Sequence, residues 1–204
     1  MNRPSYLLLK ANADQLPLRA NSVSLVIATP PYLGERRTRK NQYCTSDAQE
    51  YERWLRRSLA EATRIVKPGG TILLHNRRPR RRTARGERLV EFDVLQKALR
   101  GGGRAPKQLR TETFVTRFAD VVEFSWWALP VRLYRTLIGR YSLPGETLAH
   151  IFSGSGNSGL AALELSRSPV LVDLHHHRQV QRRLRKKIRS RRASRPHLSA
   201  RNSR

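Results

Sequence analysis

Residues 148–174, LAHIFSGSGNSGLAALELSRSPVLVDL, contain the pattern that decides the fold class of this 204-residue chain. The apolar segment 148–152 predicts a strand, 158–166 predicts a helix, and 169–174 predicts a second strand. A strand, a crossover helix and a second strand are the repeating unit of α/β folds with a parallel sheet. The chain is long enough for one such domain.

The loop inside this unit matches the glycine pattern G-x-G-x-x-G. Gly154 permits the tight turn, Gly156 lets a ligand approach the backbone, and Gly159 allows the helix to pack closely on the strand. Asp173, seventeen positions after Gly156, can accept hydrogen bonds from the two hydroxyls of a ribose. The segment therefore predicts a site for an adenosine-containing cofactor; a tight turn without a ligand is the alternative.

Further outward, a second apolar strand is predicted at 22–28, SVSLVIA, and is stopped by two prolines. Further strands are predicted at 6–10, at 71–75 and, one or two, within 111–124. Helices are predicted at 48–66 with Asp47 as cap, at 89–99, at 130–141 and, with a basic sequence, after 174. Turns or loops are predicted at 68–70 and 77–85. This alternation predicts a largely parallel sheet with helices on both faces.

The loop Thr29-Pro30-Pro31-Tyr32 follows the strand 22–28 directly. Functional loops lie at the carboxyl ends of parallel strands. The prolines restrict the backbone, so the Thr29 hydroxyl and the Pro30 carbonyl are held in position to accept hydrogen bonds from an amino group. Tyr32 offers a flat face on which a base taken out of a duplex can stack. The same four residues are also compatible with a rigid turn that has no catalytic role.

The formal net charge is +26 and the isoelectric point is about 11.7. Such a chain attracts polyanions, which indicates nucleic acid as its partner; ribosome or membrane-surface association and simple solubility are the alternatives. The arginines that we expect to contact phosphates or guanine edges are Arg77, Arg78, Arg80, Arg81, Arg82 and Arg85. A basic segment begins at Arg182, and the end of the chain, 189–204, is predicted to be a disordered basic tail.

Cysteine and histidine usage argues against a metal site. Cys44 is the single cysteine, which rules out a disulfide within the chain and a cysteine-based metal site. Three adjacent histidines, 175–177, point in different directions on a helix and are expected to be solvated. No leader segment or membrane-spanning run is recognisable, so we expect no membrane partner and a cytoplasmic location.

Taken together, these motifs resemble the amino-group DNA methyltransferases of the permuted type, in which the catalytic loop precedes the cofactor loop. The matching stretches are 11–13, 16–18, 22–32, 61–70 (EATRIVKPGG), 142–146 (SLPGE) and 152–156, and the likeness extends over most of residues 6–188. The resemblance implies a Rossmann-like, mostly parallel seven-stranded sheet in permuted order. It also implies a methyltransferase domain at 1–188 with a short target-recognition insert at about 76–127.

The same resemblance implies an activity. S-adenosylmethionine would donate a methyl group directly to N4 of cytosine or N6 of adenine, in a base flipped out of double-stranded DNA. Thr29, Pro30, Pro31 and Tyr32 would be catalytic, and the cofactor would be held by Asn12, Phe152, Gly154, Ser155, Gly156 and Asp173. Thr29, where the N6-adenine enzymes carry Asp, favours cytosine.

One departure from the family pattern is serious. The family has Asp-Pro-Phe before the glycine loop, whereas this chain has His150-Ile151-Phe152. A histidine cannot replace the carboxylate that helps to hold the methionine end of the cofactor, so we expect weakened cofactor affinity. A catalytically impaired DNA-binding protein and an RNA methyltransferase are the alternative functions. A restriction–modification system, an orphan role and phage self-protection are all compatible with the sequence.

Overall fold

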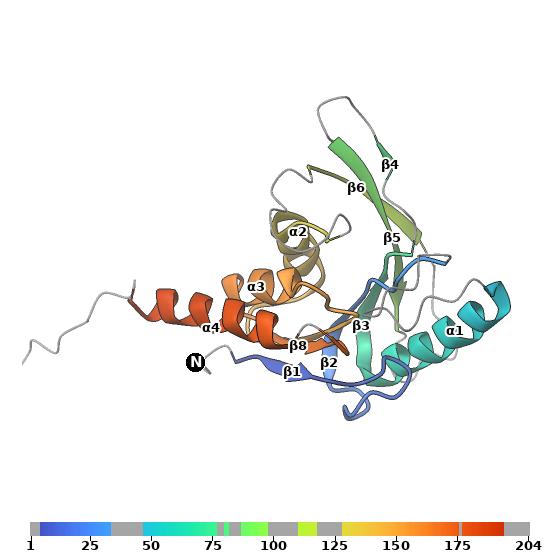
Figure 1. Ribbon diagram of the computed structural model, residues 1–204, viewed down its shortest axis with the longest axis horizontal. Coiled ribbons are helices and arrows are strands. Elements are labelled where there is room, and N and C mark those ends of the chain that lie inside the picture. Colours follow the sequence, from blue (N-terminus) through green and yellow to red (C-terminus); the bar gives the residue numbers. More distant parts are fainter. Residues whose placement is uncertain are drawn as a thin grey trace, which may run out of the picture.

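The computed structural model describes residues 5–33, 47–76, 80–81, 87–97, 110–117, 128–175 and 177–193. Strands and helices alternate over residues 23–74 and 131–193, whereas the described elements between residues 66 and 117 are all strands (Figure 1). They are β1 (Leu7–Leu9), β2 (Val23–Ala28), α1 (Ala48–Ile65), β3 (Val66–Leu74), β4 (Arg80–Arg81), β5 (Glu87–Gln96), β6 (Arg110–Arg117), α2 (Val131–Tyr141), β7 (Thr147–Ile151), α3 (Asn157–Glu164), β8 (Ser168–Val172) and α4 (His177–Ala193).

All of the strands in the described residues form one sheet in the order β1-β8-β7-β2-β3-β5-β4, with β6 paired to β5. The first five strands in this order are parallel to one another, and β5 pairs antiparallel with β3, β4 and β6. The α/β, Rossmann-like, mostly parallel arrangement that the sequence predicts is confirmed. The eight strands of the described part of the chain include the two-residue β4.

The chain leaves β7 and β2 in opposite directions, although these two strands are neighbours. From β7 it crosses through α3 to β8 on one side, and from β2 it crosses through α1 to β3 on the other side. Ligands of open α/β sheets bind outside the carboxyl ends of strands at such a switch point. The fold therefore locates the candidate site between the ends of β2 and β7.

Side chains alternate between the two faces of the sheet, and different helices cover each face (Figure 1). Val26 and Ile72 pack on one face with Ile65 of α1. Leu25 packs on the other face with Leu137 of α2. Because both faces of the central strands are covered, β2 is buried along its whole length, as expected for a parallel strand.

The two ends of α1 are held by polar contacts. Asp47 caps the helix as predicted, because its Oδ1 accepts hydrogen bonds from the amides of Gln49 at 2.8 Å and Glu50 at 3.2 Å. Near the other end, Arg64 donates to Glu61 through two nitrogens, at 2.7 and 2.8 Å. The hydrogen bonds from Arg64 are the main reason that the pKa of Glu61 is lowered.

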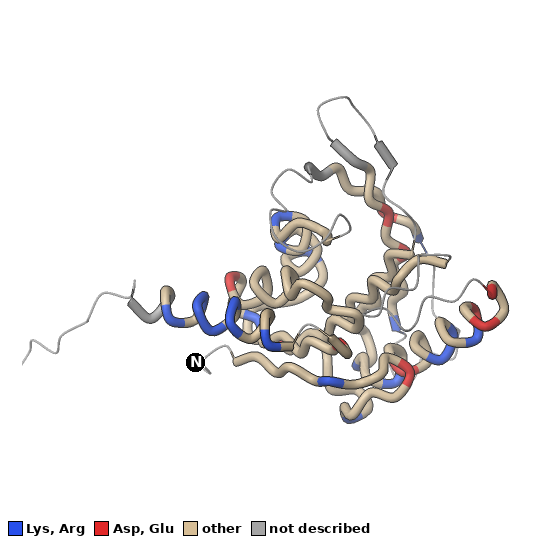
Figure 2. The backbone as a smooth tube through the Cα atoms, viewed as in Figure 1, with Lys and Arg blue, Asp and Glu red and all other residues tan. Residues whose placement is uncertain are grey.

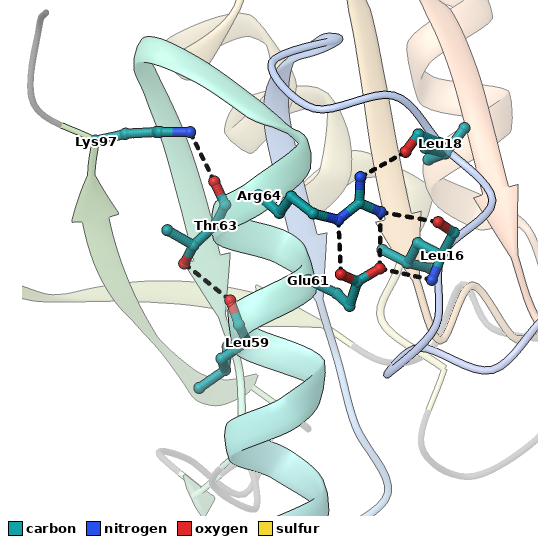
Figure 3. A network of polar contacts seen from close by, with 7 residues as sticks. All are labelled: Leu16, Leu18, Leu59, Glu61, Thr63, Arg64 and Lys97. Carbon is teal, nitrogen blue, oxygen red and sulfur yellow. Dashed lines mark hydrogen bonds and ion pairs between the residues drawn. The ribbon is translucent and has the colours of Figure 1, made fainter.

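This Glu61–Arg64 pair ties α1 to the loop between β1 and β2 (Figure 3). Glu61 accepts from the amide of Leu16 at 2.7 Å, while Arg64 donates to the carbonyls of Leu16 at 2.9 Å and Leu18 at 2.8 Å. Lys97 donates to the carbonyl of Thr63 at 2.8 Å near the last turn. The loop that contains Asn12 is therefore fastened to a helix that packs on the sheet.

One predicted element is wrong. Residues 89–99 were expected to form a helix, but β5 occupies Glu87–Gln96. Val90, Phe92 and Val94 alternate with Glu91 and Asp93 and are buried in the core that α2 covers. A period of two places these three apolar side chains on one face of a strand, which a helix would not do.

Other boundaries differ from the prediction. The segment 68–70, expected to be a turn, lies within β3, which begins at Val66. The pairing of β3 with β2 is irregular there, because the register shifts between Val23 and Leu25. Arg80–Arg81, expected in a loop, pairs with β5. Helix α4 continues to Ala193 and so contains the first residues of the tail that we expected to be disordered. The rest of that tail lies outside the described residues.

Candidate active site

The predicted catalytic and cofactor loops lie side by side at the carboxyl edge of the parallel strands. Thr29 follows β2, Phe152 follows β7, and Asp173 follows β8. Strand pairing aligns Ala28 with Ile151, and Ile151 with Val172, so the three loops begin at the same level of the sheet. The fold thus brings together residues that are more than a hundred positions apart in the sequence.

The loop Thr29–Tyr32 is fixed by contacts from other elements. Tyr51 of α1 donates its hydroxyl proton to the carbonyl of Pro31 at 2.9 Å. Tyr32 is 9% exposed, and its hydroxyl lies 2.9 Å from Nε2 of His75, the residue after β3. His75 Nδ1 lies 2.7 Å from the carbonyl of Glu91, which can only accept, so this nitrogen carries the proton. In the neutral ring Nε2 then accepts from Tyr32.

Thr29 is joined to the strand on its other side. Its hydroxyl lies 2.9 Å from Nε2 of His150 and donates to the carbonyl of Phe152 at 3.2 Å. The second ring nitrogen of His150, Nδ1, lies 2.6 Å from the hydroxyl of Ser158 in α3. A continuous chain of polar contacts therefore links the predicted catalytic loop, β7 and the helix that follows the glycine loop.

His150 is enclosed by the protein. Its exposed fraction is 1%, and the ring of Tyr134 from α2 packs against it with centroids 5.4 Å apart. Burial lowers the pKa of His150 to about 3, although the negative charge of Asp173 acts in the opposite direction. Burial likewise raises the pKa of Tyr134. Both rings are neutral at physiological pH.

The glycine loop needs its glycines for different reasons. Gly154 and Gly156 have φ angles of +47° and +75°, in the left-handed region that favours glycine. A Cβ on Gly156 would lie 2.7 Å from Val180 of α4. Gly159 has an ordinary backbone, but a Cβ there would lie 2.6 Å from Cδ1 of Leu171. The close packing of α3 on β8 that was predicted from Gly159 is therefore present.

Asp173 is hydrogen-bonded to the glycine loop. One carboxylate oxygen accepts from the amide of Gly154 at 2.7 Å, and the other accepts from the amide of His175 at 2.9 Å. Arg183 of α4 donates to the carbonyl of Ser155 and, at 3.0 Å, to Oδ1 of Asn157. The loop is thus held by an acid on one side and a cation on the other.

The remaining cofactor candidates also lie near this edge. Asn12 is exposed in the loop after β1, and its carbonyl accepts from the amide of Gln15 at 3.2 Å. Phe152 has a φ angle of +75°, and its ring packs against Trp54 with centroids 5.3 Å apart. Ser155 is partly exposed.

The predicted phosphate-binding arginines are not located. Arg77, Arg78, Arg82 and Arg85 lie outside the described residues, and the structure describes Arg80 and Arg81 only as backbone. Within the described part of the chain, no group of three or more His, Cys, Asp or Glu side chains is placed to hold a metal ion, and no helix is long and apolar enough to cross a membrane.

Three residues around the site were not singled out from the sequence. His75 had a usable signal, because it directly follows a buried strand and so lies at the functional edge. Tyr51 lies within the predicted helix 48–66, and its contact with Pro31 depends on how that helix packs. Arg183 lies among many arginines in α4, and no local pattern distinguishes it.

Comparison with known families confirms the resemblance that the sequence predicts. Residues 23–118, just under half of the chain, match the model of the N6/N4 methyltransferase family, described as DNA methylase. The matched range includes the Thr29–Tyr32 loop and ends before the glycine loop. No curated protein sequence matches the chain.

Solved structures match over most of the chain. A protein assigned as a DNA modification methylase from Thermus thermophilus has 18% identity and a TM-score of 0.59, with 92% of this chain and 96% of that chain covered; it was also solved with S-adenosyl-L-methionine. The PvuII DNA methyltransferase, which is cytosine-N4-specific, has 14% identity and a TM-score of 0.53, with 84% of each chain covered. At these identities the comparison establishes the fold.

Proposed function

We propose, from the DNA methylase match and the shared fold, that this chain transfers a methyl group from S-adenosylmethionine to an exocyclic amino group of a base in double-stranded DNA. N4 of cytosine is the favoured position and N6 of adenine the alternative. The proposal extends to the finer assignments: Thr29, Pro30, Pro31 and Tyr32 as the catalytic loop, and the loops after β1, β7 and β8 as the cofactor site.

The observation that supports this proposal most strongly is the direct contact between the predicted catalytic loop and the strand that leads into the glycine loop. Thr29 follows β2, and His150 lies in β7 just before the glycine loop; their side chains are 2.9 Å apart across the switch point of the sheet. A group-transfer enzyme needs its donor site and its acceptor site side by side. The fold achieves this by pairing β2 with β7.

The residues present suit the cofactor. A Cβ on Gly154 would meet no atom within 4 Å, so the backbone there is open to a ligand. Each oxygen of Asp173 accepts one backbone hydrogen bond, and a carboxylate has about four acceptor positions, which leaves capacity for two ribose hydroxyls. Bound S-adenosylmethionine would supply an electrophilic methyl carbon on a sulfonium.

The protein would contribute mainly by positioning the target base. The carbonyl of Pro30 and the oxygen of Thr29 accept hydrogen bonds from the amino group, which directs the lone pair of its nitrogen toward the methyl carbon. The loop residues would hold the amino nitrogen in line for the methyl group that bound S-adenosylmethionine would supply, and the proton that the methylated amino group loses would pass to solvent. Contacts of Pro31 with Tyr51 and of Tyr32 with His75 keep this loop in place.

Thr29 supports the preference for cytosine. In the family that the sequence resembles, Ser or Thr at this position accompanies N4-cytosine and Asp accompanies N6-adenine. The described part of the chain contains no residue whose contacts distinguish the two bases, so the preference depends on this one side chain.

The test is methyl transfer from labelled S-adenosylmethionine to unmethylated duplex DNA, followed by analysis of the nucleosides. We expect label on N4-methylcytosine. A Pro31→Ala, Tyr32→Ala double variant should lose it, whereas Glu52→Gln on the exposed surface of α1 should retain it. Unlabelled RNA as competitor distinguishes an RNA methyltransferase from a DNA enzyme.

Each result leads to one conclusion. Label on N6-methyladenine would overturn the preference for cytosine but keep the enzyme class. Preferential labelling of RNA would replace DNA as the substrate. No label despite tight DNA binding would favour a protein that keeps the methyltransferase fold without the activity.

A further inference from the structure

We infer that His150 is a positioning residue for the catalytic loop: its Nε2–H donates to the Thr29 hydroxyl, fixes the direction of that hydroxyl, and makes no contact with the cofactor. This inference rests on the proposed function, because it assigns a role in the reaction to a residue outside the catalytic loop. It also revises the expectation that histidine at this position weakens cofactor binding.

The direction of the hydrogen bonds follows from the chain of contacts. A carbonyl oxygen can only accept, and we assign the single Thr29 proton to the carbonyl of Phe152, 3.2 Å away. With the proton placed there, the hydroxyl accepts from His150, and Nε2 of that ring carries a proton. In the neutral ring Nδ1 is an acceptor, and the Ser158 hydroxyl donates to it over 2.6 Å.

The surroundings of His150 keep this arrangement rigid. The residue pairs with Ile27 of β2 and Leu171 of β8 in the centre of the parallel sheet. Its polar partners come from the loop after β2 and from α3, so both ring nitrogens are engaged within the protein. With 1% of its surface exposed, the imidazole has no face directed to a ligand.

The direction of the Thr29 hydroxyl matters for the reaction. Its only proton is committed to Phe152, so the oxygen presents lone pairs on its other side. One lone pair accepts from His150, and the phenol of Tyr134 is a further hydrogen-bonding partner of the same hydroxyl, so an incoming amino group would share the oxygen with that phenol. A hydroxyl held in this way acts as an acceptor for an amino group and cannot compete with it as a donor.

The tautomer of His150 can be measured without any methyl transfer. Nitrogen-15 NMR of the full chain, with the His150 signals identified by their absence in His150→Gln, reports which ring nitrogen carries the proton. We expect protonated Nε2, unprotonated Nδ1, and no titration between about pH 5 and pH 8, where an exposed histidine titrates. Among titratable groups, the Asp173 carboxylate acts on this ring through its charge, and the Tyr134 phenol packs against it.

Two matched variants test the role. Gln places its amide nitrogen near the position of Nε2 and retains a donor for Thr29, whereas Asn reaches only as far as Nδ1 and contacts Ser158 alone. We expect His150→Asn to lower kcat by about 10- to 100-fold and His150→Gln to recover most of it. The Kd for S-adenosylmethionine should change less than about 2-fold in both variants, because His150 does not contact the cofactor.

The outcomes separate this inference from the proposed function. A proton on Nδ1, or titration at an ordinary pKa, would overturn the inference whatever the activity. Weaker cofactor binding by the Asn variant with unchanged kcat would overturn it too, because His150 would then belong to the cofactor site. If the wild-type chain shows the expected tautomer but methylates no DNA, the proposed function fails, and the role of His150 in the reaction fails with it.

Should the Asn variant not fold, Ser158→Ala gives the same decision. It removes the donor to Nδ1 and leaves the imidazole in place. We expect a smaller loss of kcat and a partial shift of the ring proton toward Nδ1. An unchanged NMR spectrum together with unchanged kcat would contradict the inference.

Discussion

The carboxylate of Asp173 accepts a hydrogen bond from the backbone amide of Gly154 at 2.7 Å, nineteen positions earlier in the chain. The acid that was predicted to bind ribose therefore also holds the glycine loop in its left-handed conformation. One residue would thus shape the loop and contact the ligand, which makes the cofactor site sensitive to a change of a single oxygen.

We predict that Asp173→Asn weakens S-adenosylmethionine binding by about 10-fold or more, because a hydrogen bond to a charged group contributes about 1.5–3 kcal/mol. Asn replaces one accepting oxygen with a donor, so either Gly154 or His175 is left without its acceptor. Calorimetric titration measures the Kd. Unchanged affinity would mean that Asp173 has no role in the cofactor site.

Two glycines in helices provide a matched pair for stability. A Cβ at Gly159 would lie 2.6 Å from Leu171 and 3.2 Å from Leu184, in a packed part of the core, whereas a Cβ at Gly139 meets nothing within 4 Å. We expect Gly159→Ala to lower the free energy of unfolding by about 1–3 kcal/mol and Gly139→Ala to raise it by about 0.4–1 kcal/mol. Urea unfolding measures both, and equal effects would contradict the packing of α3 on β8.

The buried His150 predicts how stability depends on pH. Burial lowers its folded-state pKa to about 3 from the ordinary 6.5, so below pH 6.5 only the unfolded chain takes up a proton at this residue. The contribution of neutral His150 to the free energy of unfolding is therefore complete above pH 6.5. It falls by about 1.4 kcal/mol per pH unit as the pH drops toward 3.

Urea unfolding at about pH 7.5 and about pH 5.5, on either side of the ordinary histidine pKa, checks this, with His150→Gln as the reference because glutamine does not titrate. The advantage in unfolding free energy of the wild type over the variant should shrink at the lower pH. A constant difference between the two proteins would show that the pKa of His150 is not lowered.

The basic helix α4 predicts salt-dependent binding of DNA. Lys and Arg residues recur along the backbone of α4 (Figure 2), and Arg182, Arg185 and Arg189 are exposed at helical spacing. Changing these three to Gln should reduce the slope of log K against log salt by about 0.9 for each phosphate that is no longer neutralised.

The control has the same charge change on another helix, with Arg53, Arg56 and Arg57 of α1 replaced by Gln. Fluorescence anisotropy with an unspecific duplex at several salt concentrations measures the slopes. Equal slopes for the two triple variants would show that net charge alone matters and that α4 is not a DNA-binding surface.

Local signals in the sequence determined much of this protein. The apolar run of β2, the capping by Asp47, the G-x-G-x-x-G pattern and the acid after β8 each depend on neighbours within a few positions, where backbone preference and burial pattern decide the structure. These signals were sufficient for the fold class, both loops and the order of most elements.

Tertiary structure decided what depends on distant partners. The short apolar run of β5 was assigned to a helix, and only pairing with β3 and β6 establishes it as a strand. The contact of Thr29 with His150 spans 121 positions and exists because β2 and β7 pair. The charge and tautomer of that histidine follow from burial and from its two partners, which are properties of packing and have no local signature in the sequence.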